Sequence, residues 1–424
     1  MLNKPRNPAY SLPPDSQILN EIPSPYIIKH ASESVKSPFK ILIITCGGTL
    51  AQVKTPEGNL TATNSKSGKD LFQRINIATE NHVHLSILDL PPKDSTNYNP
   101  RDLQRMALAL YKHYDDYDAF GMTIGTDRMT EVGSHLSFSL RGWGKMCNIT
   151  GSQISDSEPG SDAKKNLENM IRVLTIEGKK LRGFYITFAS KVLSVLDCLK
   201  ICDNDLNAFH PKNTDGGLIE IGPTMRRKSR YHEFANRQIQ AATTQKELSL
   251  STDLHQDEIL HIDDRLGMNV DGCMMMLESG LYKAVVITGR GTGNTSVNAD
   301  ETTGQPTPED LPYSLNAFFA RAAELNMPVI VGTTVPHGVG YMTAYKPGKE
   351  ALALNAIPGS TMTLATIFAK TGRLIADGVS NAEFGIAFHE NTIGEIYEDA
   401  LDEEGIKITK FMQERYEKIL QNRT

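Results

Sequence analysis

The stretch Ile43-Ile44-Thr45-Cys46-Gly47-Gly48-Thr49-Leu50-Ala51 decides the fold of this chain. An apolar run typical of a buried strand is followed by two glycines and a threonine. Glycine has no Cβ, so the backbone turns tightly there and approaches a ligand closely. In open α/β sheets, ligands bind outside the carboxyl ends of the strands. The stretch therefore predicts a strand of an α/β sheet that presents the hydroxyl of Thr49 at a ligand-binding edge.

A second stretch, Met122-Thr123-Ile124-Gly125-Thr126-Asp127, repeats this design further along the chain. Each stretch alone is also typical of a purely structural turn, because glycine turns follow strands throughout α/β folds. Two predicted strand ends that each present a threonine favour a second interpretation. Together they indicate nucleophilic chemistry on a small polar substrate.

Around these two stretches, strand-like and helix-like segments alternate. The first series of predicted elements has strands at 39–45, 83–88, 119–124, 147–150 and 183–188, with helices at 68–75, 100–111, 130–140 and 163–174. A second series has strands at 259–261, 283–288 and 329–334, with helices at 268–279, 311–325 and 393–421. This order favours an α/β fold with a mostly parallel sheet and helices on both faces.

The chain has 424 residues, which is long for one domain, so we expect two. Residues 1–38 are rich in proline and predict an extended or disordered leader. Residues 39–212 predict a larger N-terminal catalytic α/β domain. The polar stretch 213–257 predicts a linker. Residues 258–424 predict a smaller C-terminal α/β domain with a terminal helix.

Composition excludes several classes of partner. The net charge is −6 with both signs interspersed, and no basic stripe occurs, so we expect no nucleic-acid partner. No stretch of about 18 apolar residues occurs, so we expect no membrane span. The five cysteines are odd in number in a large chain, which disfavours a disulfide scaffold and favours a reducing, cytoplasmic location. The spacing of Cys198 and Cys202 does not fit a zinc site, so we expect no metal.

At the two glycine-threonine stretches the sequence resembles the L-asparaginases, a family of two-domain amidohydrolases that use a threonine nucleophile and no cofactor. The family's first strand ends in Thr-Gly-Gly-Thr-Ile-Ala, which corresponds to residues 46–51 of the stretch 45–51 here, with Cys46 in place of the first threonine. Its second strand ends in Gly-Thr-Asp-Thr-Met, which corresponds to Gly125-Thr126-Asp127-Arg128-Met129. Segments 113–118 and 149–154 resemble the corresponding segments of the family's cytoplasmic bacterial branch. The resemblance extends from about residue 39 to 371 and is strongest up to Lys200.

The resemblance implies catalytic roles for four residues. Thr49 corresponds to the nucleophile, Thr126 to the second active-site threonine, and Asp127 to the carboxylate that holds the substrate's α-amino group. Lys200 corresponds to the active-site lysine. A threonine hydroxyl is a weak nucleophile at neutral pH and needs a base or a cation beside it, which a lysine can supply. Without the resemblance, Lys200 would be taken for a surface lysine on a loop.

The resemblance also implies substrate-binding roles. Ser95 and Thr96 lie in a loop, Asp94-Ser95-Thr96-Asn97, whose serine binds the substrate's α-carboxylate in the family. The Gly48 region offers backbone N–H groups that can stabilise an oxyanion. Asn294 lies in a glycine-asparagine loop that reaches a neighbouring subunit's site in the family. The alternative for Ser95 and Asn294 is a plain turn, because both stretches have good turn chemistry.

The sequence departs from the family in two ways that bear on function. The family's mobile lid carries a tyrosine close to the nucleophile, but residues 56–63 contain none and Leu60 stands in that place. Arg128 replaces a threonine after the motif aspartate; if it points inward, it adds charge and bulk beside the substrate.

The expected activity is hydrolysis of L-asparagine to L-aspartate and ammonia through an acyl-enzyme on Thr49, without cofactor or metal. The expected assembly is a homodimer or homotetramer with sites at the subunit interface. Two alternatives stay open: an amidohydrolase with an altered substrate (glutamine or a larger amide), and a relative that binds a small ligand without catalysis.

Overall fold

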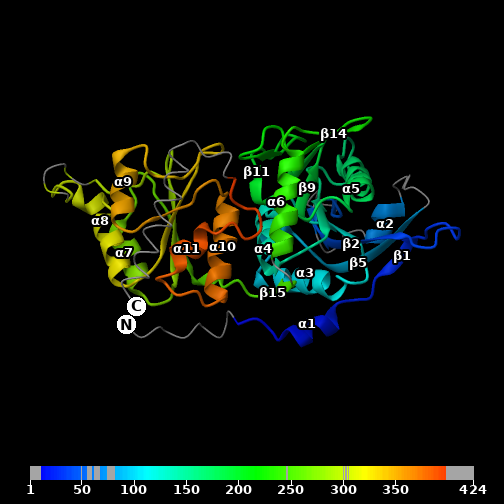
Figure 1. Ribbon diagram of the computed structural model, residues 1–424, viewed down its shortest axis with the longest axis horizontal. Coiled ribbons are helices and arrows are strands. Elements are labelled where there is room, and N and C mark those ends of the chain that lie inside the picture. Colours follow the sequence, from blue (N-terminus) through cyan, green and yellow to red (C-terminus); the bar gives the residue numbers. More distant parts are fainter. Residues whose placement is uncertain are drawn as a thin grey trace. The chain divides into compact units, whose positions relative to one another are not determined.

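The computed structural model describes residues 11–48, 50–54, 60–61, 67–73, 82–244, 247–298, 300, 303 and 305–397. The chain divides into two compact units (Figure 1). The first, which we call the large unit, is Leu12–Asp253, and the second, the small unit, contains the chain from Leu254 onward. None of the helices within the described ranges combines the length and apolar character needed to cross a membrane.

The large unit is built on a mixed sheet with the strand order β1-β5-β2-β6-β8-β9-β10-β13-β14 in the described part of the chain. Its parallel centre consists of β5 (Val83–Lys93), β2 (Phe39–Gly47), β6 (Ala119–Thr123), β8 (Met146–Thr150) and β9 (Gly183–Phe188). Antiparallel strands complete both sides, namely β1 (Tyr26–Lys29), β10 (Lys191–Ser194), β13 (Ile219–Ile221) and β14 (Met225–Arg227). The central strands are buried on both faces, which explains their nearly continuous apolar sequences.

The described helices of the large unit connect these strands in the alternating order expected from the sequence. They are α1 (Asp15–Glu21), α2 (Gly68–Gln73), α3 (Pro100–Lys112), α4 (Met129–Ser139), α5 (Ala163–Glu177) and α6 (Tyr231–Thr244). Helix α3 begins where Asn99 and Asp102 form a capping box around Pro100. The strands and helices predicted in this unit at 39–45, 100–111, 130–140 and 183–188 are confirmed.

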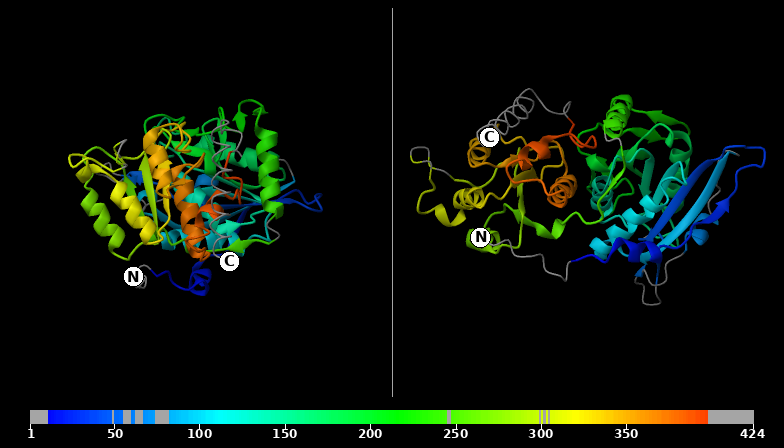
Figure 2. Two further views of the ribbon diagram at one scale, coloured as in Figure 1. Left: turned by 60° about the vertical axis from the view of Figure 1, so that its left-hand side comes forward. Right: turned by 60° about the horizontal axis from the view of Figure 1, so that its bottom comes forward.

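Two segments hold more secondary structure than their composition suggests. The leader contains α1 and β1, and β1 pairs antiparallel with β5, as the right-hand view of Figure 2 shows. Residues 213–257, expected to form a linker, contain β13, β14, α6 and β15 (Ser249–Leu250). Two side chains of this segment bind a buried carboxylate: Arg227 pairs with Glu177 at 2.8 Å, and the hydroxyl of Tyr231 donates to the same residue.

The connections on either side of β2 mark a topological switch point in the large sheet. From β2 the chain moves to β5 on one side, and later returns to β6 on the other side. The direction of the strand order therefore reverses between these two neighbours. In open α/β sheets the carboxyl ends of the strands at such a reversal are the usual ligand-binding place.

The small unit has a parallel sheet in the order β16-β17-β18-β19 among its described residues. The strands are β16 (Ile259–Asp263), β17 (Ala284–Gly289), β18 (Val329–Thr333) and β19 (Ile357–Pro358), and the helices are α7 (Val270–Glu278), α8 (Asn316–Glu324), α9 (Lys346–Ala353), α10 (Leu364–Ala376) and α11 (Phe384–His389). Alternate side chains of β17 belong to two hydrophobic cores. Val285 and Ile287 are in a core with apolar residues of α7 and α8. Val286 is in the other core, with apolar residues of α10 and α11.

A buried ion pair and a buried histidine lie where the segment after α11 packs against α10. Lys370 on α10 donates to Glu395 and to the carbonyl of Glu390, each at 2.5 Å. The carboxylate of Glu395 also accepts hydrogen bonds from Thr392 and from the amide of Ile393. His389 lies beside them, and burial lowers its pKa to about 4. This cluster anchors the segment that follows α11.

Candidate active site

The two glycine-threonine stretches lie side by side at the carboxyl ends of β2 and β6. Gly47 and Gly48 have φ angles of +86° and +88°, which side chains rarely adopt. A Cβ at Gly48 would lie 2.3 Å from the amide nitrogen of Gly125, and one at Gly47 would lie 2.6 Å from that of Lys93. Both glycines are therefore required for the backbone to pass between its neighbours. Thr49, the expected nucleophile, lies outside the described residues.

Three predicted catalytic residues are in direct contact. The ammonium of Lys200 donates to Thr126 Oγ1 at 3.0 Å and to Asp127 Oδ1 at 2.6 Å. Thr126 and Asp127 lie three and four residues after the end of β6, whereas Lys200 is the last residue of β11 (Cys198–Lys200), far along the chain. The side chain of Lys200 is 18% exposed and that of Asp127 is 60% exposed. Asp127 therefore keeps a face open to an incoming cation.

A buried carboxylate sets the position of the strand that carries Lys200. β11 pairs antiparallel with β12 (Phe209–Pro211), and Asp197 immediately precedes β11. Asp197 accepts hydrogen bonds from the backbone amides and side chains of Asn213 and Thr214, just after β12. These bonds join the two open ends of the hairpin, so Lys200 is presented from a rigid element.

Lys200 also determines the charge state of its partner. The hydrogen bond from Lys200, its positive charge and a hydrogen bond from Thr96 together hold the pKa of Asp127 below its ordinary value. Thr96 Oγ1 donates to Asp127 Oδ2 at 3.2 Å. Asp127 is consequently ionised throughout the neutral range and suited to bind an ammonium group.

Ser95 and Thr96 form a short 3₁₀ turn against the second motif. The turn is η3 (Ser95–Asn97), capped by Asp94, whose side chain accepts from the Thr96 amide. Ser95 is buried, and a Cβ at Gly125 would lie 2.4 Å from its hydroxyl oxygen. The structure thus brings Gly48, Ser95, Thr96, Thr126, Asp127 and Lys200 together.

Gln153 is a member of this cluster that the sequence did not single out. Its Oε1 accepts from the Thr126 hydroxyl at 3.2 Å, and its Nε2 donates to the carbonyl of Asp203 at 2.9 Å. Asp162 fixes the Gln153 backbone by accepting its amide at 3.1 Å. Gln153 therefore connects Thr126 to the loop after Lys200. A glutamine two residues after Gly151 in the 149–154 segment was the available signal.

Arg128 lies at the rim of the cluster. Its Nε donates to the carbonyl of Thr96 at 3.3 Å, and its Nη1 pairs with Glu131 at 2.7 Å. The side chain is 43% exposed. Arg128 therefore binds the backbone of the Ser95–Asn97 turn, and part of its side chain is exposed to solvent.

Sequence comparison identifies the part of the chain that carries this geometry. Residues 40–232 match the family model described as asparaginase, N-terminal. This part of the chain belongs to the asparaginase family. The matched range includes Thr49 and every described member of the cluster above.

Individual relatives agree with this assignment. The chain is similar to an L-asparaginase of Thermococcus kodakarensis, with 26% identity over 361 residues, covering 84% of this chain and 99% of the relative. L-asparaginase 1 of Escherichia coli is 45% identical over 83 residues, 20% of this chain and 25% of the relative. One subunit of the glutamyl-tRNA(Gln) amidotransferase of Aeropyrum pernix is 25% identical over 297 residues, 66% of this chain and 62% of the relative.

The fold agrees as well. The solved thermostable L-asparaginase of Thermococcus kodakarensis superposes with a TM-score of 0.69 at 24% identity, covering 85% of this chain and 99% of that chain. The α/β class and the smaller second sheet predicted from sequence are therefore the asparaginase fold.

Two further predictions about the candidate site concern residues at the edge of, or outside, the described ranges. Of the lid region, the described residues form the short strands β3 (Val53–Lys54) and β4 (Leu60–Thr61), which pair antiparallel. Residues 55–59 and 62–66 lie outside the described residues, as does the side chain of Leu60. Asn294 belongs to the small unit, in a turn where its amide and carbonyl bond to the backbone of Arg290. Among the described residues its buried Oδ1 has no hydrogen-bond partner.

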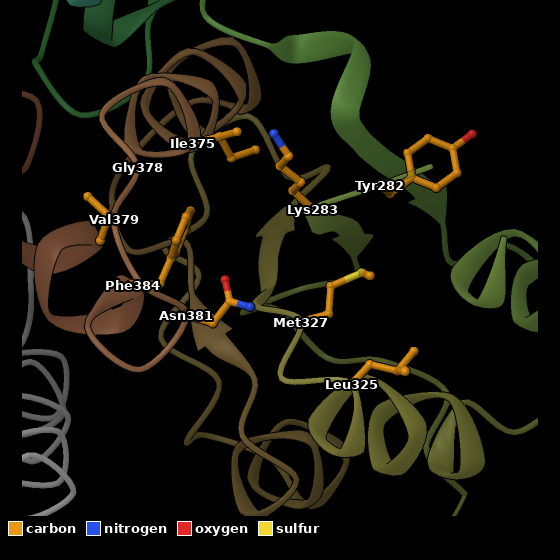
Figure 3. Close-up of a pocket in the computed structure, with 9 residues that line it drawn as sticks. All are labelled: Tyr282, Lys283, Leu325, Met327, Ile375, Gly378, Val379, Asn381 and Phe384. Atoms are coloured by element: carbon orange, nitrogen blue, oxygen red, sulfur yellow. The ribbon is translucent and has the colours of Figure 1, made fainter. Parts of the chain in front are cut away.

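A separate pocket of about 260 Å³ lies in the small unit, away from the asparaginase motifs in sequence (Figure 3). Ile375, Val379 and Phe384 line one side, and Leu325 and Met327 the other. Lys283, the charged residue of its lining, is paired with Glu258 at 2.9 Å. The pocket lining lacks a nucleophile with an adjacent base.

In the described residues, no group of three His, Cys, Asp or Glu side chains is placed to hold a metal ion.

Proposed function

We propose that this protein hydrolyses L-asparagine to L-aspartate and ammonia, with Thr49 as the nucleophile. The observation that carries the proposal is the Thr126–Asp127–Lys200 cluster beside the Gly47-Gly48 turn at the carboxyl ends of β2 and β6. In this mechanism Thr49 Oγ1 attacks the side-chain amide carbon, the C–N bond breaks, and the proton from Thr49 leaves with the amine as ammonia. Water then cleaves the ester and restores the threonine.

The described residues have matching roles in this proposal. Asp127 binds the α-ammonium of the substrate on its exposed face, and Ser95 with Thr96 receives the α-carboxylate. Lys200 places positive charge at Thr126, which lowers the cost of moving a proton through that hydroxyl. The Gly48 amide, held close to Gly125, contributes to the stabilisation of the oxyanion.

The decisive experiment is ammonia release from L-asparagine and L-glutamine at neutral pH by the wild type and Thr49→Ala. We expect release from asparagine and its loss by at least about 10³-fold in the variant. Thr224→Ala, an exposed threonine in the turn between β13 and β14, is the matched control and should retain full activity. Binding of asparagine without ammonia release in the wild type would instead support a non-catalytic ligand-binding protein.

A second candidate substrate is a different or larger amide. Two observations favour it: Arg128 at the rim of the site, and the similarity to one subunit of a glutamyl-tRNA(Gln) amidotransferase. Under this alternative, glutamine or an amide within a larger molecule is turned over faster than asparagine. Arg128→Thr should then shift the preference toward asparagine, and an unchanged preference would remove Arg128 from the argument.

We further propose an assembly and a location. A homodimer or homotetramer would let Asn294 of one copy complete the site of another, and light scattering showing a fully active monomer would contradict this. Cys46, Cys147, Cys198, Cys202 and Cys273 are all free thiols, which fits the reducing cytoplasm. The substrate is a small molecule, and neither a cofactor nor a metal enters the proposed reaction.

A further inference from the structure

Gln52 lies where the loops that follow three strands of the large sheet meet. Its backbone amide and that of Ala51 donate to the carbonyl of Gly48, at 3.2 and 3.0 Å, and close the turn after β2. Its carbonyl accepts from the hydroxyl of Ser155 at 2.6 Å, in the loop after β8. Its side-chain Nε2 donates to Oδ2 of Asp94 at 3.2 Å, directly after β5. Gln52 is 3% exposed, so one buried residue connects all three loops.

The contact with Asp94 connects Gln52 to the Ser95–Asn97 turn. The other oxygen of this carboxylate, Oδ1, accepts from the backbone amide of Thr96 at 2.9 Å and caps the turn. Thr96 in turn donates its hydroxyl to Asp127 at 3.2 Å. The two oxygens of Asp94 are therefore divided between the turn and Gln52. Through them, the turn is fixed relative to the backbone that begins at Gly48.

Hydrogen bonds, rather than packing, hold the outer part of this turn. The side chains of Thr96 and Asn97 are exposed, and Asp94 is only half-buried. Arg128 donates to the carbonyl of Thr96 from the rim, at 3.3 Å. On the inner side, Gln52 is buried, and a buried amide needs a hydrogen-bond partner, which Asp94 supplies. Losing the Gln52 donor should therefore let the turn shift.

We propose that Gln52 is a positioning residue that sets the place of the Ser95–Asn97 turn, and with it the affinity for the α-carboxylate and α-ammonium groups of the substrate. This inference rests on the proposed function, in which Ser95, Thr96 and Asp127 bind these groups. Gln52 acts through Asp94. The contact between Lys200 and Thr126 does not pass through Asp94, so the effect belongs in KM rather than in kcat.

The test compares Gln52→Met with Gln104→Met in the full chain. Gln104 is 1% exposed, and its Nε2 donates to Asp15 Oδ1 and to the carbonyl of Pro13, each at 2.8 Å, between α3 and α1. Methionine has a similar length but no donor, so we expect both variants to lower Tm by roughly 3–8 °C. In Gln52→Met we expect KM for asparagine to rise about tenfold, with kcat within about threefold. In Gln104→Met both constants should stay within about twofold.

Asp94→Asn tests the same contact from its half-buried side. An asparagine offers one oxygen in place of two, so it cannot accept from both Gln52 and the Thr96 amide as the carboxylate does. We expect KM to rise at least about fivefold. In the double variant, KM should stay within about threefold of the higher single value, because both changes break one contact.

Three results would overturn the proposal: a KM for Gln52→Met within about twofold of the wild type, an equal rise in Gln104→Met, or effects of Gln52→Met and Asp94→Asn that multiply in the double variant.

Hydrogen exchange separates this inference from the proposed function. We expect exchange in a peptide that covers residues 94–98 to accelerate at least about fivefold in Gln52→Met and to stay unchanged in Gln104→Met. If the wild type releases no ammonia, the proposed function fails, and the exchange result alone decides whether Gln52 holds the turn. Unchanged exchange in Gln52→Met would reject that role.

Discussion

The two units each contain a lysine–carboxylate pair of almost the same length, but in opposite surroundings. Lys200 and Asp127 in the large unit are 2.6 Å apart, with side chains 18% and 60% exposed. Lys370 and Glu395 in the small unit are 2.5 Å apart, with side chains 2% and 0% exposed. The carboxylate of the exposed pair can still bind a ligand from solvent, whereas the groups of the buried pair are used within their own unit. Solvent access, rather than the pairing, separates a candidate reactive site from a structural anchor.

Removing one partner of the buried pair should have the largest effect. Lys370→Met leaves Glu395 as an uncompensated buried charge, so we expect the free energy of unfolding to fall by about 3–5 kcal/mol. This change in the free energy of unfolding is measured by denaturant titration of the full chain, with a spectroscopic probe in the small unit that reports unfolding. Lys346→Met, which removes a partly exposed pair with Glu350, is the control and should cost at most about 1 kcal/mol. A loss below about 1 kcal/mol for Lys370→Met would contradict the comparison.

The histidine beside the buried pair should make the small unit sensitive to acid. The folded-state pKa of His389 is about 4, below the ordinary 6.5, because burial disfavours its charged form. The unfolded chain therefore binds the proton first. Stability that is present above pH 6.5 should be lost as the pH falls from 6.5 to 4, by up to about 3 kcal/mol.

His389→Asn removes this titration, and its unfolding free energy should vary less than that of the wild type across the same window. The comparison requires unfolding curves of both proteins at several pH values between 4 and 7. Parallel curves for the two proteins would show that His389 does not contribute.

The exposed pair should give the reverse pattern, a loss of activity with little loss of stability. Lys200→Met should reduce kcat/KM for asparagine by at least about 100-fold, because Thr126 loses the adjacent positive charge. The free energy of unfolding should change by at most about 1 kcal/mol, since the pair is partly exposed. Lys164→Met, an exposed lysine of α5, should leave kcat/KM unchanged. Equal activity in the two variants would remove Lys200 from the mechanism.

The smallest expected effect concerns the acid limit of activity. Lys200 and Thr96 hold the pKa of Asp127 below its ordinary value, so its carboxylate persists as the pH falls and is lost only below about pH 4. In Thr96→Val one of these hydrogen bonds is absent, and the acid limb of kcat/KM should move upward by less than about one pH unit. The pH–rate profiles of the two enzymes provide the measurement; a limb that stays in place or moves downward would contradict the assignment.

The sequence predicted the motif strands well because their signals are local. A buried apolar run followed by Gly-Gly-Thr or Gly-Thr-Asp contains both the strand and its end, and β2 and β6 appear where expected. The resemblance to the family added Lys200, whose contact with Thr126 no local pattern contains. The segment 213–257, expected to be a linker, shows where prediction from local patterns ends. Its polar residues bind a buried carboxylate, Glu177, that is distant in sequence.

The residues that the sequence missed act through distant partners. Gln153 matters because the loop at 202–205 returns to it, and Tyr98 matters because its hydroxyl donates to the carbonyl of Cys46, which is distant in sequence. Neither contact leaves a periodic or compositional trace. Helix α9 was also missed, since Pro347 and Gly348 in its first turn are more typical of a loop.

The short strand β1 has a consequence for the behaviour of the protein at high concentration. β5 carries a run of β-branched and aliphatic residues and would otherwise form the open border of the large sheet. Such a border is a template on which other chains can add strands and start aggregates. β1 occupies this border, and Tyr26 secures it by donating to Asp89 at 2.8 Å. The segment before the first motif thus protects this edge of the sheet from strand addition, and a chain shortened past Lys29 is expected to aggregate.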